Sequence, residues 1–350
     1  MNATKNNDVT LRWMIFLVVA VLGLAYVKWF PYYQRAFLAA SHHSIGVSIL
    51  TGTASNPPRP SLAAALDYAW AYGNAIWKAM VLGLLLGSAV QILVPRAWVA
   101  KAFGATGFAS VATAGMLSIP GMMCTCCAAP VVSGLRSCRA SPGAAITFWL
   151  GNTMLNPATL VFMGFVLGWQ WSALRLIFGV LMVFGVGYIV NCLTRSAPTE
   201  PVSFPFANGA GDDEAPGLIW RWLRILLQMS VRLLPEYIVI VLLLGAARAW
   251  LFPHMGPDVN NELMWISAFA FAGALFVIPT AGEIPIVQAM LLLGVGAGPA
   301  AALLVTLPPI SMPSLAMLLS SFTYRTLALV AGSVFALGVA AGLVAVALGF

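Results

Sequence analysis

Charged side chains are scarce in this sequence. Of its 350 residues only 8% are Asp, Glu, Lys or Arg, while 61% are hydrophobic; soluble domains have about 25% and 45–50%. A chain with so little charge cannot cover the surface of a water-soluble fold. With about 20 to 25 residues for each helical crossing, there is room for about seven to ten hydrophobic elements. The sequence therefore predicts an all-α integral membrane protein whose surroundings are the lipid bilayer.

Two further absences exclude other classes of function. The chain has no P-loop, so any energy source other than an ion gradient would have to come from a partner. For a permease we expect no enzyme activity and no cofactor. The net charge of +7 is not gathered on a soluble basic domain, which nucleic-acid binding would require. Lys and Arg are instead more frequent in the loops that lie inside if the N-terminus is cytoplasmic, which predicts that orientation. The sequence sets no oligomeric state.

The five cysteines do not form a disulfide framework. Three of them, Cys124, Cys126 and Cys127, lie within four positions, where a CxC or a vicinal pair closes too small a ring for an easy bridge. We expect free thiols at these positions. Cys138 and Cys192 stand singly, as small buried hydrophobic residues commonly do.

The hydrophobic segments divide the chain into four parts. We expect a first transmembrane helix at about 13–30 with an external loop from Pro31 (residues 1–69), a first repeat (70–194), a polar cytoplasmic linker (195–217) and a second repeat (218–350). Three correspondences support the repeat: LLLG at 84–87 and at 242–245, Pro130 with Pro285, and Gly143 with Gly298. Each half then has an odd number of crossings, so the second half is inverted relative to the first.

Each half also contains one segment too short to span the membrane twice. In the first half, residues 105–119 lead to the cysteines and only about eight apolar residues then precede Arg136. We interpret this as a re-entrant hairpin with the cysteines at its tip, and residues 263–293 as its counterpart with a tip at 279–285. Crossings broken at 152–157 and 308–313 complete the halves, and we expect the two tips to flank one cavity. Inverted repeats with discontinuous helices are typical of secondary transporters.

Four short motifs resemble those of the ArsP/YraQ-like permease family. They are Cys124-Thr125-Cys126 ahead of Pro130, Leu155-Asn156-Pro157, Gly282-Glu283 ahead of Pro285, and Met312-Pro313-Ser314. The resemblance covers roughly residues 70–350 and implies a multi-pass permease of the bacterial inner membrane. Characterised members of that family export trivalent organoarsenicals. This chain departs from the pattern in its third thiol, Cys127, and in Ala281, where a second-half cysteine is often found.

The polar residues at the breaks are the candidate site. Thiolates are soft ligands that favour Cu(I), Zn(II) and, by the same logic, trivalent arsenic, so we expect the three clustered cysteines to bind a small thiophilic solute or a metal. Residues at the tip and at the helix breaks could contact the same solute: Thr125, Asn152, Asn156 and Ser311. Glu283 is a lone acid at the second tip, where desolvation favours its protonated form, and it could carry a proton during transport.

Two other functions fit the same residues. The first is a permease for a sulfur-containing metabolite, in which the thiols exchange with the substrate. The second is a membrane thiol-disulfide oxidoreductase that uses the CxC of Cys124 and Cys126 as its redox pair. This interpretation is weakened because we expect no CxxC redox pair here and because the second tip carries no thiol.

Overall fold

The protein is an all-helical membrane protein. The computed structural model describes residues 2–46, 49, 58–195, 218–252 and 256–350, and every regular element in these ranges is a helix. Five helices in this part of the chain are long and apolar enough to cross a bilayer. A sixth span results if α4 (Arg96–Phe103) and α5 (Phe108–Ser118), which meet at 112°, are taken together. The polar linker predicted at 195–217 lies outside the described residues except for Arg195.

The first helix is longer than the sequence suggested. It runs through α1 (Asn2–Leu24), a π-helical stretch η1 (Ala25–Trp29) and α2 (Phe30–His42). The expectation that a loop begins at Pro31 was wrong. Pro31 lies in the first turn of α2, directly after the π-helical stretch, where the altered hydrogen-bond pattern tolerates a residue without an N–H. The next helix, α3 (Leu62–Leu93), also begins earlier than expected, because the Ser61 side chain caps it by accepting from the backbone N–H of Ala64 at 3.0 Å.

Each half contains a helix–tip–helix hairpin. In the first, α5 leads through a 3-10 turn, η2 (Ile119–Gly121), to the tip and α6 (Thr125–Ser137) returns; Ser141 N donates to Phe103 O at 2.8 Å at its base. In the second, α12 (Leu263–Leu275) and α13 (Glu283–Leu292) flank the tip, and Gly296 N donates to Val259 O at 2.8 Å. One backbone hydrogen bond thus closes the base of each hairpin.

Two helices are interrupted where the sequence predicted breaks. The first consists of α7 (Pro142–Met154) and α8 (Pro157–Val166), and the second of α14 (Ala297–Thr306) and α15 (Met312–Leu318). The polar residues at the breaks satisfy the freed backbone groups. Asn156 accepts from the N–H groups of Ala158 and Thr159 at 3.0 and 3.3 Å, and Ser311 forms a capping box with Ser314.

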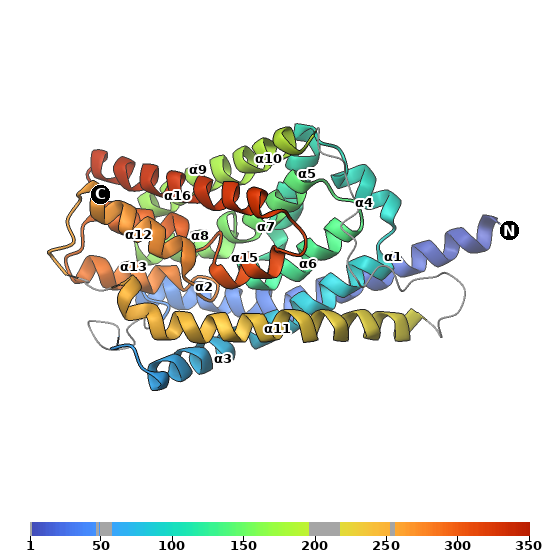
Figure 1. Ribbon diagram of the computed structural model, residues 1–350, viewed down its shortest axis with the longest axis horizontal. Helices are drawn as coiled ribbons and strands as arrows, with labels where there is room; N and C mark the ends of the chain where they lie inside the picture. The colour runs from blue at the N-terminus through green and yellow to red at the C-terminus, as the bar shows by residue number, and fades with distance from the viewer. Residues whose placement is uncertain (1, 47–48, 50–57, 196–217, 253–255) are drawn as a thin grey trace.

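The long helices run roughly along one axis of the molecule (Figure 1). Helices α3 and α11 (Leu218–Leu251) lie side by side, and α6 packs on α3. On the other side α7 contacts α5 and α10 (Gly187–Thr194), whereas α14 contacts α12 and α16 (Tyr324–Ala347). Helix α9 (Trp169–Val180) joins α10 through a second π-helical stretch, η3 (Leu181–Val186). The two chain ends lie at opposite ends of this axis (Figure 1).

Two glycines let α6 approach α3 closely. A Cβ atom at Gly83 would lie 2.2 Å from the carbonyl oxygen of Cys127, and one at Gly87 would lie 2.5 Å from the backbone of Pro130. Small residues allow backbones in membrane helices to approach in this way. The glycines of α3 therefore fix the position of the first hairpin tip.

Candidate functional site

Two of the three clustered thiols face each other at the start of α6. Cys124 is the N-cap residue of this helix and has an extended backbone, and Cys127 lies in its first turn. Their sulfur atoms are 2.8 Å apart, both side chains are buried, and neither cysteine is in a disulfide. Residues three apart on a helix lie on the same face, so the start of α6 brings the two sulfurs together.

The third thiol points elsewhere. The sulfur of Cys126 lies 3.7 Å from Thr125 Oγ1 and 3.8 Å from Ser311 Oγ. The CxC assignment of the redox pair was therefore wrong: the sulfurs that meet belong to Cys124 and Cys127, whose spacing is CxxC. Residues two apart on a helix do not face each other. The three thiols thus do not form one ligand set, and the part of the chain that the structure describes holds no cluster of three His, Cys, Asp or Glu able to bind a metal ion.

The first tip contacts the broken helix of the second half. Thr125 Oγ1 lies 3.3 Å from Ser311 Oγ, and both side chains are buried. Trp149 of α7 donates from Nε1 to the backbone oxygen of Thr125 at 3.0 Å, which holds the start of α6 in place. The fold therefore brings together Thr125, Cys126 and Ser311, three of the predicted site residues.

The two predicted amides are buried at the first break. Asn152 donates from Nδ2 to Phe148 O at 2.8 Å, and its Oδ1 lies so close to Gly121 that a Cβ there would be 2.1 Å away. Asn156 caps α8 through its Oδ1. Asn152 Oδ1 and Asn156 Nδ2 have no hydrogen-bond partner among the described residues. Their contact with a solute stays a prediction.

Glu283 has a partner that the sequence did not indicate. Its carboxylate is buried at the start of α13 and pairs with Arg175 of α9, which also donates to the backbone oxygen of Thr153 at 2.8 Å. Arg175 lies inside α9 and is only 1% exposed, a burial that the sequence analysis did not predict. A lone arginine inside a hydrophobic run was the available signal.

A cavity of about 850 Å³ is lined by both hairpin tips. Cys124 lines it from the first tip and Thr280, Ala281 and Gly282 from the second. Met122 (φ 48°) and Ala281 (φ 67°) have left-handed backbones, so both tips carry a conformation that non-glycine residues seldom adopt. Lys28 of η1 also lines the cavity and was not singled out by the sequence.

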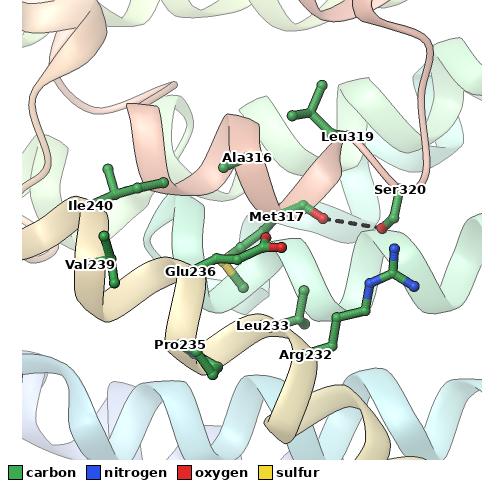
Figure 2. Close-up of a pocket in the computed structure, with 10 residues that line it drawn as sticks. All are labelled: Arg232, Leu233, Pro235, Glu236, Val239, Ile240, Ala316, Met317, Leu319 and Ser320. Atoms are coloured by element: carbon green, nitrogen blue, oxygen red, sulfur yellow. Dashed lines mark hydrogen bonds between the residues drawn. The ribbon is translucent and has the colours of Figure 1, made fainter.

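A second cavity, of about 670 Å³, lies between α11 and α15 (Figure 2). Helix α11 contributes Arg232 and Glu236, and α15 and the residues after it contribute Met317 and Ser320, whose Oγ donates to Met317 O at 3.3 Å (Figure 2). Ser311, the N-cap of α15, contacts the first hairpin tip. Both cavities thus adjoin elements that meet at Thr125 and Ser311.

Comparison with known proteins gives the family. A family model described as a predicted permease (ArsP_1) matches residues 61–347. The chain is 50% identical to the UPF0718 protein YraQ of Escherichia coli (strain K12) over 330 residues, which cover 94% of this chain and 93% of YraQ. The chain belongs to this permease family. The UPF0718 protein MJ0584 of Methanocaldococcus jannaschii is 22% identical over 302 residues, 67% of this chain and 82% of that protein.

Family membership and the long apolar helices make the protein a multi-pass membrane transporter. No solved structure matches the chain.

Proposed function

We propose that the protein exports a small thiophilic solute, a trivalent organoarsenical or a soft metal ion, and that Cys124 and Cys127 bind it. One observation carries this proposal: two reduced, buried sulfurs lie 2.8 Å apart where a helix begins, and one of them lines a cavity. Thiolates are the preferred ligands of soft centres. A pair held in this way could exchange a solute without rearranging the helix that carries it.

The chemistry needs no electron acceptor. A monosubstituted arsenous acid, R–As(OH)2, would form two As–S bonds with Cys124 and Cys127 and lose two hydroxyls, which leave as water with the two thiol protons. Arsenic stays trivalent and neither sulfur is oxidised. The reverse reaction with water releases the solute. For a soft metal ion the pair would supply two sulfur ligands in place of the three-sulfur set expected from the sequence.

Transport is proposed to follow alternating access within an inverted repeat. The equivalent hairpins, each closed by one backbone hydrogen bond, and the equivalent broken helices support the division into repeats 70–194 and 218–350. The Thr125–Ser311 contact joins elements of the two proposed repeats, and each of the two cavities adjoins one of the elements in that contact. Breaking the Thr125–Ser311 contact would expose the thiols to one side of the inner membrane or the other. The N-terminus is proposed to lie in the cytoplasm.

Glu283 is the proposed proton-coupling residue. Its carboxylate is buried against Arg175, which lies on a helix of the first half. Protonation would remove the charge that Arg175 needs and weaken a contact between the halves. Proton binding and a change in the packing of α13 against α9 would thereby be linked.

Binding of phenylarsine oxide to the purified protein tests the thiol pair directly. Native mass spectrometry should show one bound molecule per chain. Cys124→Ser and Cys127→Ser should each weaken binding by about 100-fold. In the wild type the second As–S bond forms within the molecule at a high effective concentration of thiol, and each variant loses that second bond. Cys126→Ser, the matched control, should bind like the wild type. Equal loss in all three variants would argue for a three-thiol site, and no loss in any would remove the pair from the site.

A thiol-disulfide oxidoreductase is the second candidate. The CxxC spacing of Cys124 and Cys127 at the start of a helix favours it, since this is where reactive cysteine pairs occur. The pair would give two electrons and two protons to a partner disulfide. Mass spectrometry of alkylated thiols before and after mild oxidation separates the candidates, because the redox enzyme must cycle through a Cys124–Cys127 disulfide and a permease must not. A permease for a sulfur metabolite would instead show thiol exchange with its substrate.

A further inference from the structure

The charged side chains that line the cavity at the hairpin tips are mainly cationic. Four basic side chains contribute to its wall, Lys28, Arg35, Lys78 and Arg248, against a single acid, Asp67. In a chain with only 8% charged residues such a gathering is unusual. Low-dielectric walls lined by one sign of charge concentrate ions of the opposite sign.

Lys28 is the innermost of these cations. It is 5% exposed, and its Nζ lies 3.3 Å from Tyr32 Oη and 3.3 Å from Thr280 Oγ1, both neutral hydroxyls. No carboxylate among the described side chains forms an ion pair with it. A buried ammonium without a counter-charge is costly, and an anion in the cavity would supply that charge. Because Thr280 belongs to the second tip, this hydrogen bond also joins η1 to that tip.

Lys28 and the sulfur of Cys124 share this cavity. Both residues line its wall. Its volume of about 850 Å³ lies within the range of about 300–1,000 Å³ usual for small-molecule sites. A ligand that satisfies both groups must carry a negative charge and, beside it, an atom that a thiol can attack or exchange with.

We propose that this cavity binds a small anion, with its charge at Lys28 and a soft, thiol-reactive atom at Cys124. The proposal goes beyond the proposed function, because neither the neutral R–As(OH)2 nor a soft metal cation carries the negative charge that Lys28 would bind. It rests on that function only for the step of transport. It does not depend on arsenic.

Charge-selective modification of Cys124 tests the site without any transported solute. The probes are two methanethiosulfonates of similar size, one with a sulfonate and one with a trimethylammonium group. Each transfers its thioalkyl group to the cysteine thiolate, forming a mixed disulfide and releasing methanesulfinate. The protein used is a variant in which the other four cysteines are replaced by serine. Each rate is divided by the rate of the same reagent with free 2-mercaptoethanol. The anionic reagent should then react at least about tenfold faster than the cationic one.

Three variants complete the test. Lys28→Met should bring the ratio of normalised rates close to one, Lys28→Arg should retain the anion preference, and Lys101→Met should not change it, because Lys101 of α4 does not line the cavity. In the single-cysteine protein that keeps Lys28, a ratio of normalised rates of one or less overturns the anion site. An unchanged ratio in Lys28→Met, or a Cys124 that reacts with neither reagent, also overturns it. A failure of arsenical binding would leave this ratio intact, so the two proposals fail separately.

Discussion

The Glu283–Arg175 pair is a buried ion pair. Both side chains are at most 2% exposed. Removing one partner of a buried pair leaves an uncompensated charge and typically costs about 3–5 kcal/mol, whereas replacing both is often neutral. The stability of the protein should therefore depend on the pair much more than on either charge alone.

A double-mutant cycle in detergent measures this dependence. Arg175→Met and Glu283→Gln should each lower the unfolding temperature sharply, and the double variant should recover most of the loss. If Glu283 also carries the proton, the double variant should be stable yet unable to couple transport to a pH gradient. Additive losses in the double variant would show that the pair makes no mutual contribution.

At this scale the sequence indicated the residues but not their partners. Glu283 and the clustered thiols stand out because polar groups are rare in this chain. Which two lone charges meet depends on the packing of α9 against the start of α13, 108 positions apart in sequence. Which two sulfurs meet depends on where α6 begins, and the choice of Cys126 over Cys127 failed for that reason.

At the scale of elements, the approach of α3 to α6 sets the position of the thiol tip. Gly83→Ala would place a methyl group against the backbone oxygen of Cys127, at 2.2 Å if nothing moved. We expect about 1–3 kcal/mol of destabilisation from overpacking and weaker phenylarsine oxide binding, since α6 must shift. Thermal unfolding and native mass spectrometry of the same preparation report the two effects.

Gly332→Ala in α16 is the matched control. Nothing lies within 4 Å of the Cβ position there, and alanine is the better helix former by about 1 kcal/mol. This variant should be as stable as the wild type or more so. If both substitutions behaved alike, the close packing of α3 on α6 would not be what positions the tip.

Helix breaks and hairpins were predictable because Pro, Gly, Asn and Ser mark them locally. The breaks at Asn156 and Ser311 follow from capping side chains that the sequence displays. The first helix was misjudged because Pro31 usually ends a helix, and the π-helical stretch that accommodates it has no local signal. Lys28 was overlooked because its burial depends on packing against the second tip, which is distant in sequence.

For the whole molecule, topology is the testable consequence of the repeat. If a first crossing is followed by three in each half, as the proposed inverted repeat requires, the loop before α3 should lie outside the cell and the start of α16 inside. In a background with Cys192 replaced by Ala, a membrane-impermeant maleimide applied to intact cells should label Arg59→Cys. Arg325→Cys should react only after permeabilisation. Labelling of both in intact cells would contradict the inverted arrangement.

The central claim is that Cys124 and Cys127 carry a thiophilic solute across the membrane, and transport into everted membrane vesicles tests it most directly. Methylarsenite uptake should require a proton gradient, be lost in Cys124→Ser and Cys127→Ser, and persist in Cys192→Ser, whose thiol lies on the surface. Gradient-driven uptake that survives in both site variants, or no uptake by folded wild-type protein, would contradict the account.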